Sequence, residues 1–175
     1  MTGALLEIWA TPSAAAPMTR LPEGRLLAGI GLDGDRYARG GGTWAAYPAL
    51  EKQLTLIDRD DVAAVAHETG ADLAPGATRR NLVTTGIELP GLVGGWFVVG
   101  EALLFGMKRC PPCTHLERLT GARLVKAMAY RGGINAAVFV GGTVRDGDPV
   151  RVVSEAEATE RGAPTGDDRP VPRIV

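Results

Sequence analysis

Turn-forming residues divide this chain into short apolar segments, and this division constrains the fold more than any other feature. Glycine occurs 24 times and proline 12 times in 175 residues, which leaves little room for the long helices of a bundle. Between these breaks lie strand-length segments, such as the alternating QLTLI at 53–57. We therefore expect a mainly β fold, a β-barrel with a few short helical insertions.

The expected helices are few and short. An amphipathic helix is predicted after Asp58, which can act as N-cap, and it should end at Gly70. Two more are predicted at 114–119 and 122–130, broken at Gly121. The predicted strands are 4–10, 26–30, 53–57, 81–85, 96–99, 102–107, 134–140 and 150–153.

The composition changes near residue 154. Residues 1–153 are expected to form one domain. Residues 154–175 contain three prolines, five acidic and three basic residues, and few large apolar groups that could offset the entropy of ordering. We predict a disordered tail whose removal barely changes the melting temperature.

The overall charge and apolar content exclude several classes of partner. The net charge is −1, which gives no global attraction to nucleic acid or an anionic membrane. No apolar run is long enough to span a bilayer, and the N-terminus lacks the basic start of a signal peptide. With only two cysteines, we expect a cytoplasmic protein with reduced thiols.

Cys113 is the residue most suggestive of chemistry. Pro111 and Pro112 end the preceding strand, so Cys113 should begin a helix. The helix dipole and the cations Lys108, Arg109 and Arg118 then favour a thiolate. Local context equally allows a small buried apolar residue at this position. Cys110, at a strand end, is expected to be structural.

Other interpretations of these motifs are weaker. Cys110, Cys113 and His115 offer at most three zinc ligands, whereas structural zinc takes four. The C-P-P-C sequence looks like a thioredoxin-type pair but lacks the surrounding βαβ pattern. Gly40–Gly42 lacks the ending of a nucleotide-binding P-loop.

Arginines at junctions between loops and strands indicate an anion site. Arg79, Arg80 and Arg131 each stand at such a junction, and guanidinium groups suit phosphate or carboxylate. Gly132 and Gly133 would let an anion approach the backbone closely. Arg123 and Lys126 are better explained as a solvated helix face.

Several segments together resemble the MOSC domain, named for the C-terminal part of molybdenum cofactor sulfurases. The most specific are Arg80–Ile87 (RNLVTTGI) and Pro112-Cys113. The others are Gly34–Ala38, Gln53–Ile57, Gly94–Gly100, Arg131–Gly133 and Gly142–Asp148, so the resemblance covers residues 4–153. The chain lacks the pyridoxal-phosphate-dependent sulfurase domain and the ferredoxin-type cysteines of larger members, so it would depend on a redox or sulfur-donor protein.

The resemblance implies a protein that binds the molybdenum cofactor (molybdopterin) and handles molybdenum or sulfur at Cys113. Such a protein reduces N-hydroxylated compounds with a partner electron donor, or acts without turnover as a persulfide sulfur carrier or cofactor-delivery module. The cofactor-binding positions would be Arg79, Arg80, Asn81, Arg131 and Gly132. Strand ends converge on the rim of a barrel, so we predict that Arg80, Asn81, Arg131 and Cys113 line one pocket there.

Overall fold

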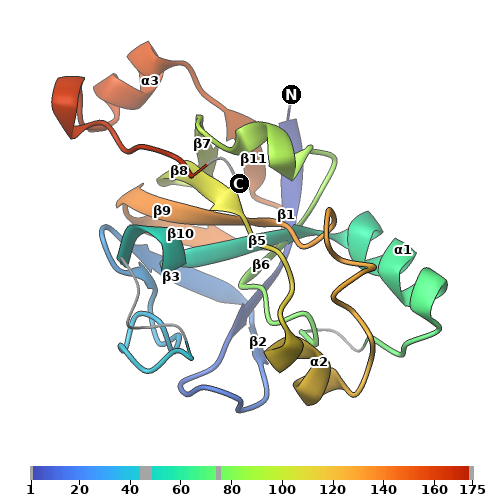
Figure 1. Ribbon diagram of the computed structural model, residues 1–175. Coiled ribbons are helices and arrows are strands. Elements are labelled where there is room, and N and C mark those ends of the chain that lie inside the picture. Colours follow the sequence, from blue (N-terminus) through green and yellow to red (C-terminus); the bar gives the residue numbers. More distant parts are fainter. Residues whose placement is uncertain (1, 44–48, 74–75, 174–175) are drawn as a thin grey trace.

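A closed β-barrel forms the centre of the molecule (Figure 1). The structure, a computed structural model, describes residues 2–43, 49–73 and 76–173. The barrel strands are β1 (Thr2–Ala10), β5 (Leu54–Asp58), β6 (Leu82–Thr85), β7 (Trp96–Val99), β8 (Ala102–Arg109), β9 (Ile134–Val140) and β11 (Pro149–Val152). Within the described residues these seven strands run in the order β11-β7-β8-β9-β5-β6-β1, and β1 closes the barrel by pairing with β11. The predicted mainly β barrel is confirmed.

Smaller elements surround the barrel. A second sheet contains β10 (Gly142–Arg145), β3 (Glu23–Leu27) and β4 (Gly31–Leu32), while β2 (Thr19–Leu21) extends the main sheet beyond β1. The short 3-10 helices are η1 (Ala49–Lys52), η2 (Leu89–Leu92) and η3 (Gly166–Asp168). No helix in the described part of the chain is both long and apolar enough to cross a membrane.

The parallel pair β5–β6 is joined through helix α1 (Arg59–Thr69). The Asp58 side chain accepts a 2.7 Å hydrogen bond from the Asp60 backbone N–H, and Gly70 ends the helix with a left-handed φ of 65°. Both helix boundaries agree with the sequence prediction. The strand register places Leu82 at the start of β6 level with Leu56, Leu56 level with Ile134, and Ile134 level with Arg109 at the end of β8. Residues 79–81 therefore lie near the segment that follows β8.

The barrel interior is filled by aliphatic and aromatic side chains from every barrel strand. Leu5, Leu54, Phe97, Leu104 and Ile134 are all fully buried there. Their burial removes a large apolar area from water and is the main stabilising contribution to the fold. A rigid core of this kind holds the loops at the barrel end in fixed positions.

The structure differs from the prediction of a disordered tail at residues 154–175. Residues 154–173 contain a helix and a 3-10 helix and pack against the barrel. Ser154 caps helix α3 (Glu155–Glu160), and Ala158 and Ala163 are buried against Trp96 and Val98 on the outer face of the barrel. Two alanine side chains are enough to anchor this segment, because the outer face of the barrel already supplies the large apolar groups. From α3 the chain returns to β8 (Figure 1), where the Arg173 backbone N–H donates to Met107 O at 2.8 Å.

The prediction of a helix at residues 122–130 is also wrong. Helix α2 spans Thr114–Thr120 and ends at Gly121 with φ 69°, but the following residues form turns. The Glu117 carboxylate accepts a 2.8 Å bond from the Val125 backbone N–H. Leu124 and Met128 are fully buried, so tertiary packing holds this segment in a non-helical path.

Candidate functional site

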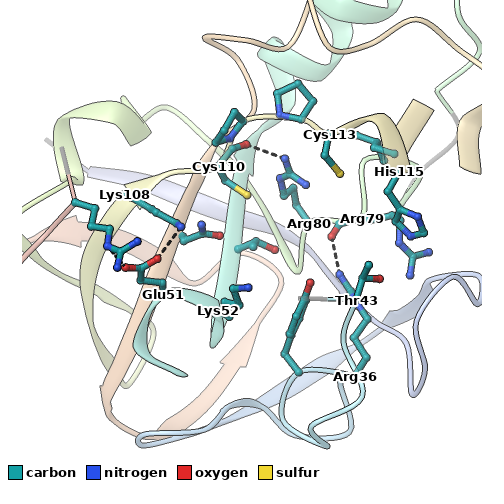
Figure 2. A pocket seen from close by; sticks show the side chains of 17 residues that line it. Arg36, Thr43, Glu51, Lys52, Arg79, Arg80, Lys108, Cys110, Cys113 and His115 are labelled. Atoms are coloured by element: carbon teal, nitrogen blue, oxygen red, sulfur yellow. Dashed lines mark hydrogen bonds and ion pairs between the residues drawn. The ribbon is translucent and has the colours of Figure 1, made fainter. Parts of the chain in front are cut away.

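A pocket of about 360 Å³ opens at the end of the barrel where β8 leads into α2 (Figure 2). This size is within the usual range for small-molecule sites. Segments distant in sequence contribute to its wall: the loop after β4, η1, the residues before β6, the end of β8, the start of α2 and the C-terminal segment. The described lining residues are Arg36, Tyr37, Thr43, Glu51, Lys52, Thr55, Arg79, Arg80, Lys108, Cys110, Pro111, Pro112, Cys113, His115, Leu116, Asn135 and Arg173.

The pocket is strongly cationic. Six of its described lining residues are arginine or lysine, and Glu51 is the one acid among them. Asp35 lies behind the wall and pairs with Arg36 at 3.1 Å. Even with Asp35 counted, the positive charges exceed the negative ones by four (six minus two). An excess of positive charge of this kind attracts anions.

Both cysteines belong to this pocket and are half-buried free thiols. Cys113 is the N-cap residue of α2, and its carbonyl accepts from Leu116 N at 2.9 Å. Its side chain also packs partly against the apolar cluster that contains Leu116 and Leu124. The predicted position of Cys113 at a helix start is therefore confirmed, and Cys110 unexpectedly shares the pocket.

Arg80 fastens the cysteine loop to the rest of the barrel end. Its guanidinium donates to the carbonyls of Cys110 at 2.8 Å, Gly132 at 2.8 Å and Thr78 at 3.1 Å. The residue is only 8% exposed, and no carboxylate lies within ion-pair distance of it among the described residues. Arg80 thus brings a positive charge to the pocket that carbonyl dipoles only partly offset.

Arg79 adopts a strained backbone conformation beside the pocket. Its φ is 58°, a region that non-glycine residues rarely occupy and that often marks functional positions. One guanidinium nitrogen, Nη1, donates to Ala16 O at 2.7 Å, but Nη2 is buried without a hydrogen-bond partner among the described residues. An unpaired buried donor costs about 1–3 kcal/mol, so an incoming acceptor would be favoured here.

Electrostatic effects around Arg79 also favour an incoming anion. Burial and then the neighbouring charge of Arg36 lower the pKa of the Arg79 guanidinium, while Asp35 and Tyr37 partly counter this. Arg36 also donates to Arg79 O at 3.3 Å and lies 4.9 Å from the centre of the Tyr37 ring. An anion beside these two arginines would relieve their mutual repulsion.

His115 adds a second orphaned nitrogen to the pocket. Its Nε2 is buried with no hydrogen-bond partner in the part of the chain that the structure describes. Figure 2 shows the His115 and Arg79 side chains on the same side of the pocket. From the sequence, His115 is a candidate only for zinc ligation. Its place in the first turn of α2, two residues after Cys113, was the available signal for a role in this site.

Three predicted site residues have other contacts. Asn81 is buried, with Oδ1 accepting from the Thr55 hydroxyl at 2.9 Å and Nδ2 donating to Trp9 O at 3.2 Å. Arg131 pairs with Glu68 of α1 at 2.6 Å. Neither is among the described lining residues, so the prediction of one shared pocket holds for Arg80 and Cys113 only. Gly132 lies against the Cys110 backbone, where a Cβ would not fit.

A second group of charges was missed from the sequence. Glu51, in η1, accepts from Lys108 Nζ at 2.7 Å and from Arg173 Nε at 2.7 Å. The three residues are far apart in the chain, and Arg173 belongs to the segment that had been predicted to be disordered. Only the fold brings them together.

Comparisons with known proteins agree with this architecture. The YuaD protein from Bacillus subtilis has a TM-score of 0.72 at 17% identity, over 87% of this chain and 96% of that one. YiiM from Escherichia coli has a TM-score of 0.66 at 22% identity, over 96% and 81%. YiiM from Geobacillus stearothermophilus has a TM-score of 0.63 at 16% identity, over 88% and 76%. At these identities the likeness shows the fold.

Fold and pocket together define a small β-barrel protein with a cationic pocket at one end of the barrel. Residues 34–151 match the model of the MOSC domain, and the chain belongs to this family. The family is generally linked to binding of the molybdenum cofactor. A search of curated proteins gave no match.

Proposed function

We propose that this protein binds the molybdenum cofactor in the cationic pocket and handles metal or sulfur at Cys113. The observation that carries the proposal is the pair of buried, unpartnered nitrogens, Arg79 Nη2 and His115 Nε2, in the same pocket as the thiol. Structures rarely leave buried polar atoms unpaired without a functional reason. A phosphate group would accept hydrogen bonds from both nitrogens if His115 presents Nε2 as a donor.

The residues present fit a phosphate-bearing pterin with a metal. Arg79 and His115 would hold the phosphate, with Arg36 contributing charge, and charge-assisted bonds of this kind are stronger than neutral ones. Cys113 is the soft ligand that a thiophilic metal prefers. Arg80 would keep the cysteine loop in place from behind. When bound, the molybdenum centre supplies two-electron redox chemistry.

The proposed reaction is the reduction of N-hydroxylated compounds with electrons from a partner protein. The MOSC resemblance supports this reaction class, and the cationic pocket supports the cofactor that it requires. The alternative is a module without turnover, in which Cys113 carries sulfur as a persulfide or the protein delivers the cofactor. Both versions use the same thiol, so chemistry rather than geometry separates them.

The anion-holding role is tested by cofactor retention. The protein is purified under anaerobic conditions, molybdenum is measured by elemental analysis, and pterin is measured by fluorescence after oxidation. Arg79→Ala should lose most of both, while the exposed Arg123→Ala, matched in chemistry but outside the pocket, should retain them. Equal retention in the two variants would refute the assignment of Arg79.

The cofactor-loaded protein then separates the two chemistries. Reduction of an N-hydroxylated purine with an artificial electron donor should be seen with the parent and lost in Cys113→Ser. If reduction is absent and the parent instead carries a persulfide at Cys113, the carrier alternative is correct. Absence of both molybdenum and persulfide in all preparations would overturn the proposal.

A further inference from the structure

The charges around Glu51 form a separate cluster within the same pocket. Lys108 and Arg173 share the Glu51 carboxylate, with both distances at 2.7 Å. The Glu51 side chain is only 7% exposed, whereas those of Lys108 and Arg173 are 25% and 59% exposed. The carboxylate is thus enclosed, and its two cationic partners remain reachable from solvent.

One carboxylate does not neutralise this cluster. Two cations contact Glu51, and Lys52 stands beside them. The pKa of Lys52 is lowered first by burial and then by the like charge of Lys108, while Glu51 partly opposes this. Lys108 and Arg173 alone exceed Glu51 by one positive charge. In a partly enclosed site an excess charge of this kind favours an added anion.

This cluster is distinct from the Arg79 site. Figure 2 shows Glu51, Lys52 and Lys108 on one side of the pocket and Arg36, Arg79 and His115 on the other, with Arg80 in between. Arg80 itself is bonded to the Cys110 carbonyl. A single phosphate group held at Arg79 therefore leaves the Glu51 side of the pocket for another group.

From this arrangement we infer that Lys108 and Arg173, with Lys52 beside them, form a second anion subsite for a phosphate or carboxylate group. Glu51 acts as an internal counter-ion that holds the cations together and competes with the incoming anion. The inference rests on the proposed function in that the first subsite belongs to the cofactor phosphate. Its ligand is consequently a molecule, or a pair of molecules, with anionic groups at both ends of the pocket.

Sulfate binding to the full-length, cofactor-free protein tests the second subsite. Sulfate is a tetrahedral dianion whose charge is constant near neutral pH. Titration calorimetry should detect two sites in the parent. Glu51→Gln, which keeps the shape but removes the competing charge, should tighten one of them by about tenfold. Arg79→Ala should remove the other and leave the first unchanged.

The variants keep failure of the two proposals distinguishable. If Glu51→Gln binds sulfate no tighter than the parent while Arg79→Ala loses its site, the second subsite is refuted and the cofactor assignment stands. If Arg79→Ala binds sulfate as the parent does while Glu51→Gln binds it more tightly, the assignment of the cofactor phosphate to Arg79 is refuted and the second subsite stands. Should Glu51→Gln fail to fold, Arg173→Met replaces it: a loss of about tenfold at one site supports the subsite, and unchanged sulfate binding refutes it.

The source of the second anionic group is found with the loaded protein. If it belongs to a separate substrate, adenosine monophosphate should bind to the loaded parent and more tightly to loaded Glu51→Gln. If it belongs to the cofactor, the cofactor released by denaturation should contain a second phosphate and adenosine monophosphate should not bind. If a cofactor-loaded protein gives neither of these two results, the inference is overturned.

Discussion

Arg79 and His115 line the same pocket, and each has a buried nitrogen without a hydrogen-bond partner within residues 2–43, 49–73 and 76–173, although 35 residues separate the two in sequence. Arg79 reaches the pocket from the loop before β6, and His115 from the first turn of α2. The loop that carries both cysteines connects β8 to that helix. The two unpartnered nitrogens and the cysteine thiols therefore lie at the same end of the barrel.

Replacing Arg79 separates backbone strain from ligand binding. Arg79→Gly should leave the free energy of unfolding of the cofactor-free protein within about 1 kcal/mol of the parent, because relief at φ 58° offsets the lost bond to Ala16. Arg79→Ala keeps the strain and should cost roughly 1–2 kcal/mol. Urea denaturation measures both. A larger loss in the glycine variant would show that Arg79 is mainly structural.

Arg80→Ala should destabilise the cofactor-free protein by roughly 2–4 kcal/mol, because three carbonyls lose a charged donor at once. Arg80→Lys should recover only part of this, since a single ammonium cannot reproduce the three directions of the guanidinium. The readout is the free energy of unfolding in urea. A neutral effect of Arg80→Ala would contradict its role in fastening the cysteine loop.

The two cysteines should differ in reactivity. Cys113 starts α2 and should react with iodoacetamide several-fold faster than Cys110 at neutral pH, as a thiol at a helix start beside cations does. Mass spectrometry of partially alkylated protein gives both rates. Ligand in the pocket should protect Cys113. Faster alkylation of Cys110 would move the proposed reactive sulfur to that residue.

The C-terminal segment should contribute to stability. A chain that ends at Ser154 loses buried Ala158 and Ala163 and uncovers Trp96, which should cost about 2–4 kcal/mol by the usual scale for buried apolar groups. A chain that ends at Val171 should fold normally but lose Arg173 and its bond to Glu51. Thermal unfolding of the two chains checks this. Unchanged melting of the shorter chain would restore the prediction of a dispensable tail.

Sulfate affinity at the second subsite should depend on Lys52. Burial and Lys108 lower the pKa of Lys52 below its usual 10.5. Since the folded pKa is lower than the unfolded one, the charged form costs stability at neutral pH, and that cost disappears as pH rises between the two values. Sulfate binding should weaken over the same interval. Lys52→Met should bind sulfate more weakly at neutral pH and show a smaller pH dependence over this interval; an unchanged pH profile would exclude Lys52 from the subsite.

The sequence was sufficient for the barrel because turn residues and strand-length segments recur along the chain, and for Cys113 because two prolines place it at a helix start. It was misleading for Asn81 and Arg131. Asn81 follows the pocket residue Arg80, and Arg131 precedes Gly132, whose carbonyl accepts from Arg80. Long-range contacts with Thr55 and Glu68 nevertheless decide where the side chains of Asn81 and Arg131 lie.

Other parts of the site depend on tertiary packing. The Glu51 cluster requires η1, β8 and the C-terminal segment to meet, and no spacing rule predicts such a meeting. Disorder was predicted for residues 154–175 from their low apolar content, but burial of two alanines depends on the face that they cover. Composition describes the segment and not the surface that receives it.

X-ray absorption at the molybdenum edge of anaerobically purified protein tests the central claim most directly. The measurement compares the parent with Cys113→Ser and uses Cys110→Ser as the control from the same loop. A protein that holds the cofactor at Cys113 should contain molybdenum with one sulfur neighbour more in the parent and in Cys110→Ser than in Cys113→Ser. Molybdenum with the same sulfur count in all three proteins would contradict the assignment of Cys113 as the ligand.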